Sequence, residues 1–267
     1  MKNTGFIGCG NMGGALARAA AKSIGGENIF LSDADEKKIA ALSKEIGANA
    51  GNNKEIAAEC KYIFLGVKPQ YLEDMLSGIK DILRKRTDRF VLVTMAAGVS
   101  VEAVTKIIGK KLPVIRIMPN TPCAYESGMV LYCANAAVKK EEISEFTEIL
   151  SKAGELDYIP ESLIDAAAAL SGCGPAYVYM FIEALADGAV SCGVPRDKAM
   201  KYAAQTVLGA AQTVIKSNMH PGALKDAVTS PGGTTIAGVL ALEKGGFRAA
   251  AQSSVIAAYK KTLELKK

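Results

Sequence analysis

Short apolar runs recur through the first 160 residues, and longer segments with apolar residues at helical spacing separate them. Runs without alternating polar positions are typical of strands that are buried on both faces of a parallel sheet. Their regular exchange with helical periodicity indicates βαβ units. The predicted strands are Thr4–Ile7, Asn28–Ser32, Tyr62–Gly66, Phe90–Met95, Val114–Met118, Met129–Cys133 and Glu155–Ile159.

The helices of this half follow from the same spacing and from residues that begin helices. Asn52 and Glu55 stand three residues apart, which is the spacing of a capping box, and we expect a turn at Ala48–Asn53. The predicted helices are Met12–Ala21, a helix from near Glu36, a short helix that ends near Cys60, Tyr71–Leu83, Ser100–Ile108 and Glu141–Lys152. Residues 1–160 are therefore predicted to form one α/β domain.

The pattern changes after Pro160. Strand-like runs end there, and alanine-rich helical periodicity continues to Lys267. Such a shift in composition is typical of a domain boundary, so we predict a second, all-α domain over residues 161–267. Its helices are expected near Ser162–Leu170, Pro175–Cys192, Pro195–Lys216, Leu224–Val228, Thr234–Glu243 and Phe247–Leu265.

The first chemical signal is the glycine-rich turn GCGNMG at Gly8–Gly13, between the first strand and the first helix. The spacing G-x-G-x-x-G in that context is the fingerprint of dinucleotide binding. Gly8 allows the tight turn, Gly10 lets a diphosphate approach the backbone, and Gly13 lets the helix pack closely on the strand. The phosphates would bind free amides at the positive end of the helix. We predict a Rossmann domain, the alternative being an ordinary glycine-rich turn.

Residues after three later strands fit the rest of such a cofactor. Asp33 ends the second strand, where an acid normally accepts hydrogen bonds from ribose hydroxyls. The alternative is a helix cap, since Asp33 or Asp35 precedes the next helix, and both roles can coexist. Asp33 would repel a 2′-phosphate, so its charge favours NADH over NADPH. Lys68 follows the third strand, where it either neutralises phosphate charge or is a solvated loop lysine. The small residues Ala96–Gly98 end the fourth strand and leave room for a flat ring such as nicotinamide.

Composition narrows the class of protein. The chain has 267 residues, a net charge of +5 and 49% hydrophobic residues, which fits a globular protein that binds small anions. The longest basic run, Arg84–Arg86, is too short for a nucleic-acid surface, and no apolar run is long enough to span a membrane. Met1–Asn3 lead into the first strand without a signal peptide, and the six cysteines lack C-x-x-C spacing. We expect a cytoplasmic protein without a metal site.

Other constellations with possible chemistry have simpler structural interpretations. Glu183 and Asp187 lie one helical turn apart, and we favour a polar seam between helices over a catalytic or metal-binding pair. The single histidine, His220, precedes a proline in a turn, which favours a structural role over that of a general base. The S-x-x-K spacing of Ser77 and Lys80 stands alone and is attributed to chance.

The segment Ser230–Thr235 is the most informative part of the second half. It has the sequence SPGGTT and immediately precedes a predicted helix. Two glycines and several hydroxyls at a helix N-terminus offer bare amides and a hydroxyl, which together suit a carboxylate. The alternative is a plain capping turn.

These motifs make the sequence similar to the pyrroline-5-carboxylate reductases over nearly the whole chain. The matching segments are GFIGCGNMG from Gly5, VKP from Val67, AAG from Ala96, MPNTP from Met118, LSGCGPAYVYMFIEALADGAV from Leu170, HPGALKD from His220 and SPGGTTIAGVLALE from Ser230. The resemblance implies a Rossmann domain and an all-α domain that interlocks with a second subunit in dimers or rings of dimers. It also implies reduction of 1-pyrroline-5-carboxylate to L-proline by hydride from NAD(P)H, the last step of proline biosynthesis.

The resemblance further implies the residues of the site. Thr235 would be the catalytic residue that hydrogen-bonds the ring nitrogen of the substrate. Gly233 and Thr234 would hold its carboxylate through their amides, and Glu161 would be an acid on the substrate side. Together with the residues derived above, the expected cofactor contacts are Gly8, Gly10, Asn11, Met12, Gly13, Asp33, Asn53, Val67, Lys68, Pro69, Ala96, Ala97 and Gly98.

Two positions depart from that family, and two other classes of protein remain as alternatives. Asp33 stands where relatives that use NADPH often have a neutral residue, and Ala227 where some have an asparagine that touches the cofactor. A β-hydroxyacid dehydrogenase would carry a lysine on the first long helix of the second domain, and Pro175–Cys192 has none. A regulatory nucleotide-binding protein would not need the intact Ser230–Thr235 segment.

Overall fold

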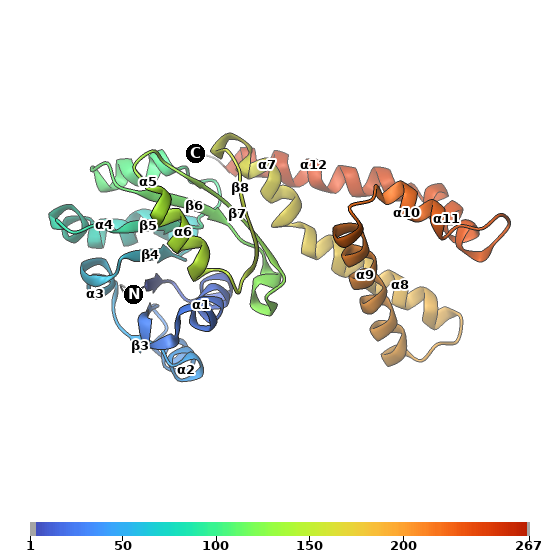
Figure 1. The fold of residues 1–267 in the computed structure, drawn as a ribbon, viewed down its shortest axis with the longest axis horizontal. Coiled ribbons are helices and arrows are strands. Elements are labelled where there is room, and N and C mark those ends of the chain that lie inside the picture. Colours follow the sequence, from blue (N-terminus) through green and yellow to red (C-terminus); the bar gives the residue numbers. More distant parts are fainter. Residues whose placement is uncertain (1–3, 266–267) are drawn as a thin grey trace. The chain divides into compact units, whose positions relative to one another are not determined.

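The computed structural model describes residues 4–265 and divides into two compact units (Figure 1). The first unit contains the chain up to Cys173 and the segment from Ala258 onward, and the second contains Gly174–Ala257. Met1–Asn3, on which the argument about a signal peptide rests, lie outside the described residues. The division differs from the predicted boundary at residue 160, because helix α7 (Glu161–Ser171) is part of the first unit.

The first unit is built on an eight-stranded sheet in the order β3-β2-β1-β4-β5-β6-β7-β8. Its strands are β1 (Thr4–Ile7), β2 (Ile29–Ser32), β3 (Asn49–Ala50), β4 (Tyr62–Leu65), β5 (Val91–Thr94), β6 (Val114–Met118), β7 (Gly128–Ala134) and β8 (Gly154–Tyr158). All seven predicted strands are confirmed, and β3 lies inside the predicted turn. The order reverses between β1 and β4, which pair in parallel on either side of the point where doubly wound sheets bind ligands.

One strand pairing in this sheet is antiparallel, that of β6 with β7. The connection between them, residues 119–127, holds only the 3-10 turn η2 (Thr121–Tyr125) and no crossover helix. A parallel return needs a connection of about a dozen residues or more, usually with a helix, so the chain turns back antiparallel here. The apolar pattern of the strands carries no information on direction, and sequence analysis therefore missed this feature.

Helices cover both faces of the sheet and begin where capping residues predict. Asp35 accepts hydrogen bonds from two amides at the start of α2, and Asn52 with Glu55 forms the expected capping box of α3. Alternate residues of the strands enter two cores, with Phe6 in one and Ile7 in the other. The helices are α1 (Asn11–Ile24), α2 (Glu36–Ile46), α3 (Asn53–Glu59), α4 (Pro69–Lys85), α5 (Val101–Ile108), α6 (Lys140–Ile149) and α7, with a 3-10 turn η1 (Gly26–Asn28).

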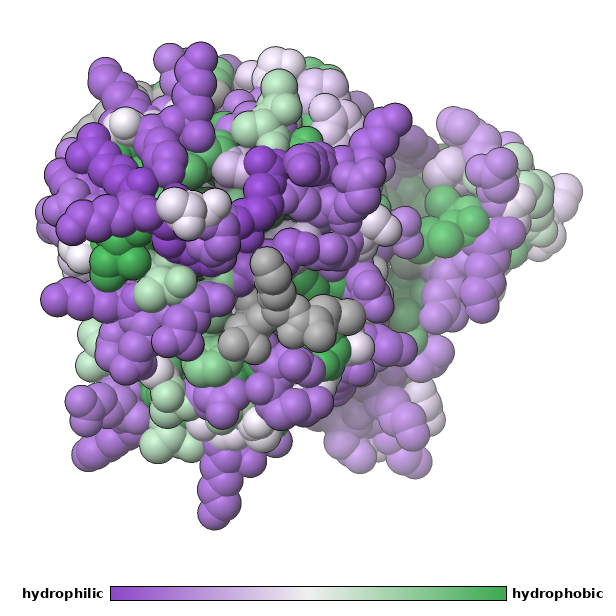
Figure 2. Space-filling view, turned by 60° about the vertical axis from the view of Figure 1, so that its left-hand side comes forward, coloured by the Kyte–Doolittle hydropathy of each residue, from purple (hydrophilic) through white to green (hydrophobic). Residues whose placement is uncertain are grey.

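One face of the first unit is largely hydrophilic (Figure 2). Figure 2 shows one face of the molecule, on which charged and polar side chains predominate over this unit and apolar residues are scattered. Within residues 4–265, none of the helices is both long enough and apolar enough to cross a membrane.

The second unit is helical and buries little of itself. Its helices are α8 (Gly174–Ser191), α9 (Arg196–Ser217), α10 (Pro221–Ala227), α11 (Thr234–Lys244) and the first part of α12 (Phe247–Leu265). Its core cluster of buried residues consists of three alanines, Ala186, Ala199 and Ala203. Large apolar side chains such as Met180 and Ile215 are mostly exposed. Apolar surface of this extent on a protein is typical of an interface with another chain.

Candidate active site

The turn between β1 and α1 is held by three glycines in close contact. Gly8 has a φ of +91°, which favours glycine, and a Cβ there would lie 2.8 Å from the amide nitrogen of Val67. A Cβ on Gly13 would lie 2.0 Å from the carbonyl oxygen of Gly8, so α1 packs directly on the turn. Gly66, which follows β4, approaches the same carbonyl, since a Cβ added to Gly66 would lie 2.3 Å from the carbonyl oxygen of Gly8. The turn therefore tolerates no side chain at these positions.

Gly10 differs from these glycines because the space beside it is open. A Cβ on Gly10 would meet no heavy atom within 4 Å. Gly10 is the N-cap of α1, no side chain caps that helix, and its first turn contains no acid. The first-turn amides of a helix have no partner within the helix, and they carry partial positive charge. The structure therefore fits a diphosphate at Gly10, with Asn11 and Met12 as the first residues of the helix beneath it.

A cavity of about 390 Å³ opens directly in front of this turn. Asp33 lies in it with both carboxylate oxygens occupied, Oδ2 by the amide of Cys9 at 2.7 Å and Oδ1 by the amide of Asp35 at 3.1 Å. Asn53 reaches the same cavity, where its Oδ1 accepts a hydrogen bond of 2.7 Å from Ser32. The cavity is lined by Ile7, Gly8, Gly10, Asp33, Ala34, Lys38, Asn53, Gly66, Val67, Lys68 and Tyr71. Six predicted cofactor residues thus meet here.

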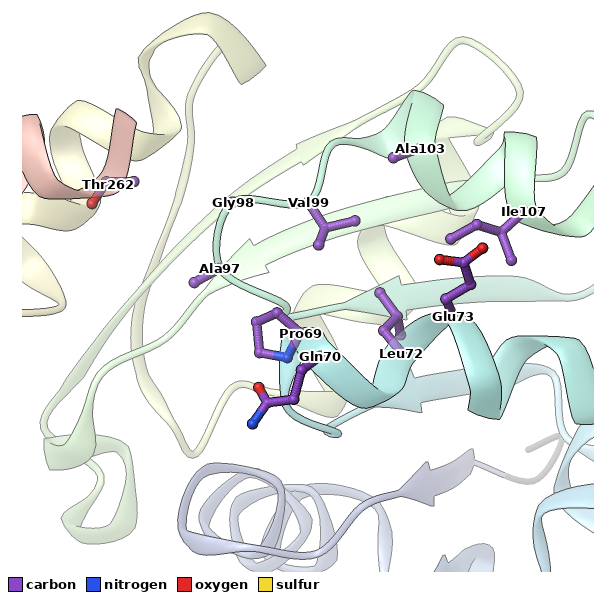
Figure 3. A pocket seen from close by; sticks show the side chains of 10 residues that line it. All are labelled: Pro69, Gln70, Leu72, Glu73, Ala97, Gly98, Val99, Ala103, Ile107 and Thr262. Atoms are coloured by element: carbon purple, nitrogen blue, oxygen red, sulfur yellow. The ribbon is translucent and has the colours of Figure 1, made fainter. Parts of the chain in front are cut away.

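Three further predicted cofactor residues, Pro69, Ala97 and Gly98, line a second cavity of about 510 Å³. Figure 3 shows Pro69 at the start of α4, opposite the turn that carries Ala97 and Gly98 beyond β5. Gly98 has a φ of +75°, and the amide of Val99 donates to the carbonyl of Ala96, so this turn is tight. The lining of this second cavity is mostly apolar, which suits the flat face of a nicotinamide ring better than a charged group.

Arg116 and Glu161 form an ion pair near the start of α5, the helix whose Ala103 lines this second cavity. Glu161 begins α7, and its Oε1 accepts a hydrogen bond of 2.8 Å from the amide of Val101 at the start of α5. The same oxygen lies 3.5 Å from Nη1 of Arg116, which is 2% exposed on β6. Arg116 also donates to Asp165 of α7. Sequence analysis missed Arg116 and Asp165, because an arginine within an apolar strand gives no signal of its partner.

The predicted substrate segment begins α11 in the second unit. Gly233 is the N-cap of that helix, and no side chain caps the amides of its first turn. Gly232 has a φ of +66°, and the amide of Gly233 donates to the carbonyl of Ser230 at 3.0 Å, which closes the turn before the helix. Thr235 is exposed in the first turn. The segment thus presents free amides and a hydroxyl together.

Two of the residues given structural interpretations, His220 and Asp187, make contacts of that kind. His220 caps α10, with its Nδ1 accepting a hydrogen bond of 3.0 Å from the amide of Gly222. Asp187 of α8 pairs with Arg196 at the start of α9, which is a polar contact between the two helices. Among residues 4–265, no group of three or more histidines, cysteines or acids is placed to hold a metal ion.

Comparisons with known proteins match both halves of the chain. A family model described as "Pyrroline-5-carboxylate reductase dimerisation" matches residues 161–265, and one described as "NADP oxidoreductase coenzyme F420-dependent" matches residues 3–98. The chain is 41% identical to pyrroline-5-carboxylate reductase of Escherichia coli K12, covering 100% of this chain and 99% of that protein.

Solved structures give the same result over the whole chain. The NADP-bound pyrroline carboxylate reductase of Plasmodium falciparum is similar with a TM-score of 0.89 and 33% identity, over 100% of this chain and 98% of that one. A pyrroline-5-carboxylate reductase of Coxiella burnetii gives a TM-score of 0.91 and 30% identity, over 100% and 99% of the two chains.

Proposed function

The chain belongs to the pyrroline-5-carboxylate reductase family, and from this premise we propose how its residues divide the work of the reaction. It is an oxidoreductase that reduces 1-pyrroline-5-carboxylate to L-proline in proline biosynthesis, with a nicotinamide cofactor. The observation that carries this conclusion is the 41% identity over the full chain, together with the open turn at Gly10.

The cofactor is proposed to extend from the first cavity to the second. Its diphosphate would lie at Gly10 and the N-terminus of α1, with Lys68 as the nearby cation that lines the same cavity. The adenosine ribose would lie at Asp33 and Asn53, and the nicotinamide ring at Ala97 and Gly98. This assignment gives a place to six of the nine cavity-lining residues that the sequence predicts for the cofactor.

NADH is proposed as the preferred cofactor. A 2′-phosphate would enter the cavity that Asp33 lines, and two negative charges a few ångströms apart repel strongly. Lys38 lines the same cavity and is the cation that a 2′-phosphate would meet. Asp33 is held more firmly, because two backbone amides fix its carboxylate. The relative from Plasmodium falciparum was solved with NADP bound, so the preference of this chain for NADH has to be tested directly.

The substrate carboxylate is proposed to bind the free amides of Thr234 and Thr235 at the start of α11, beside Gly233, whose own amide is engaged by the carbonyl of Ser230. An anion is favoured there by the helix dipole and by donors that lack an intrahelical partner. Thr235 would then orient the imine nitrogen through its hydroxyl. Glu161 is proposed on the substrate side. Its contacts with Val101 and Arg116 are both made by Oε1, and the side chain is still 38% exposed, which leaves part of the carboxylate open to a ligand.

Positioning is proposed as the main source of catalysis. The bound cofactor supplies the hydride, which adds to the imine carbon of the substrate while the nitrogen keeps its proton as a secondary amine. A protonated imine is already electrophilic, so the protein needs no strong acid, in agreement with the capping role of His220. Holding the two partners in a near-attack geometry then accounts for much of the acceleration.

Association of subunits is proposed to run through the second unit. The chain carries the family's dimerisation region over residues 161–265, and the helices of that unit leave large apolar side chains exposed. A homodimer, alone or within a ring of dimers, would cover these surfaces with a second copy. A cytoplasmic location is proposed with it, since the expected chemistry is that of small-molecule biosynthesis.

Thr235 provides the experiment that tests the substrate site. Thr235→Val keeps the shape of the side chain and removes the hydroxyl, and it should lower kcat about 100-fold because the imine is misplaced. Thr235→Ser retains the hydroxyl and should keep most of the activity. NADH affinity, measured by fluorescence titration, should be the same in all three proteins. Wild-type turnover in Thr235→Val would remove Thr235 from the mechanism.

A further inference from the structure

Arg116 is the largest fully buried side chain of the described residues, yet it is charged. Its guanidinium donates to Asp165 and lies 3.5 Å from Glu161, and both acids belong to α7. Its Nε is buried without a hydrogen-bond partner. Burying an arginine with an unsatisfied donor is costly, and an apolar residue of similar size often serves stability equally well. The contacts of Arg116 with α7 attach that helix to the sheet, but an apolar residue could do the same, so attachment alone does not explain an arginine at position 116.

The position of Arg116 in the sheet connects it to the turn beyond β5. Arg116 on β6 is the direct neighbour of Thr94, the last residue of β5. The hydroxyl of Thr94 lies 3.4 Å from the amide of Ala96, with which that turn begins. Arg116 thus lies one strand away from the turn that lines the proposed nicotinamide cavity.

Glu161 holds the other end of the same turn. Its Oε1 accepts the amide of Val101, which is the first residue of α5 and an amide without a partner inside that helix. The turn Ala96–Ser100 is thereby fixed between the end of β5 and a helix whose start is tied to α7. Since Nη1 of Arg116 lies 3.5 Å from the same Oε1, the guanidinium holds the Glu161 carboxylate in place toward Val101.

We propose that Arg116 is a positioning residue for the nicotinamide end of the cofactor, and that it acts through Glu161 and the amide of Val101. This inference rests on the proposed cofactor site, of which it names one supporting part. Arg116 touches neither cofactor nor substrate in this scheme. Its contribution is to keep the Ala96–Ser100 turn in the shape that receives the ring.

A binding experiment with a whole cofactor and a fragment tests the proposal without any turnover. ADP-ribose has the adenosine, diphosphate and ribose of NADH but lacks nicotinamide, so it engages the first cavity alone. Arg116→Gln should raise the Kd for NADH about tenfold, the size expected for one lost charge-assisted contact. The Kd for ADP-ribose should stay within about twofold. NADPH with 2′-phospho-ADP-ribose replaces this pair if NADPH binds more tightly.

Two further variants separate positioning from general destabilisation. Glu161→Ala removes the acceptor of Val101 at a partly exposed position and should change the NADH to ADP-ribose ratio in the same direction, even if Arg116→Gln fails to fold. Arg89→Gln is the matched control. Arg89 also forms an ion pair, with both carboxylate oxygens of Glu142 on α6, but it precedes β5, whereas the Ala96–Ser100 turn follows that strand. Arg89→Gln should leave the ratio unchanged.

The results of these binding experiments distinguish the positioning role of Arg116 from the proposed cofactor site itself. A changed ratio in Arg116→Gln and Glu161→Ala with an unchanged ratio in Arg89→Gln supports the positioning role. Equal weakening of both ligands, or no weakening of either, overturns it while leaving the cofactor site intact. Wild-type protein that binds neither NADH nor ADP-ribose would overturn the cofactor site and the inference together.

Discussion

The amide of Cys9 donates a hydrogen bond of 2.7 Å to Oδ2 of Asp33, which ties the glycine-rich turn to the end of β2. Sequence analysis assigned Asp33 to the ribose or to a helix cap. Of the two acids that could cap α2, Asp35 is the cap, since its Oδ1 accepts from the amides of Lys37 and Lys38. Asp33 thus supports the turn that holds the diphosphate and also brings negative charge into the cofactor cavity.

Asp33→Asn should therefore separate these two functions. The amide side chain keeps an oxygen for the amide of Cys9 and removes the charge, so the turn is retained while a 2′-phosphate is no longer repelled. We expect the ratio of kcat/KM for NADPH to that for NADH to rise at least about tenfold, which corresponds to the loss of one close repulsion. Parallel steady-state assays with both cofactors measure it.

Asp35→Asn is the matched control for this prediction. Asp35 is an acid of the same short segment, but it caps α2 and does not line the cavity. Its replacement should leave the cofactor preference as it is in wild type. A strong NADPH preference in the wild-type enzyme would contradict the argument from the charge of Asp33 before any variant is made.

Burial in the fold should make four of the six cysteines unreactive toward a thiol reagent in the native protein. Burial, with the nearby charge of Asp33, raises the pKa of Cys9 to about 12, and burial raises that of Cys60 to about 12. A thiol with such a pKa stays protonated and unreactive at pH 8. Native protein should therefore react with a disulfide reagent at Cys173 and Cys192 at most, the two exposed cysteines, whereas unfolded protein should react at all six. Rapid native labelling of Cys9, located by peptide mapping, would contradict this.

A charge placed on an exposed apolar surface should test the proposed subunit interface. Met180 lies in the middle of α8 and is 69% exposed, next to Tyr179, which is also largely exposed. Met180→Asp should shift the protein toward smaller species, because a carboxylate would have to be buried against the second copy. Lys201→Asp on α9, an exposed polar position, should leave the mass unchanged. Light scattering after gel filtration compares the two, and equal masses for all proteins would contradict an interface at α8.

The sequence was sufficient for what depends on local pattern and on motifs. Seven of the eight strands in the sheet, the helices, the glycine contacts at Gly8 and Gly13, and the capping box at Asn52 were predicted from short stretches. What it could not supply depends on pairing between distant segments. The antiparallel direction of β7 and the contact of Arg116 with Glu161 join residues that no periodicity connects. The short strand β3 was missed because two exposed residues carry no apolar signal.

The ion pair of Arg89 with Glu142 should make stability depend on pH in a predictable direction. Burial alone would raise the pKa of Glu142, but hydrogen bonds from Arg89 and from the amide of Lys139 outweigh it and hold that pKa below its usual range. A lowered pKa in the folded state adds stability that is complete above the unfolded pKa, about 4.3. That stability is lost as the pH falls through the folded value.

Arg89→Gln should therefore destabilise the protein most at neutral pH and least in acid. At pH 7 we expect a loss of about 1 kcal/mol, because Arg89 is partly exposed and solvent screens the pair. As the pH falls through the lowered pKa of Glu142 in the folded wild-type protein, the carboxylate takes up a proton and loses its pairing with Arg89, so the difference between the two proteins should shrink. Urea unfolding at pH 7, 5, 4 and 3 measures it, at one fixed protein concentration because subunit association also adds to stability. A difference that stays constant over this range would show that the Glu142 charge does not carry the effect.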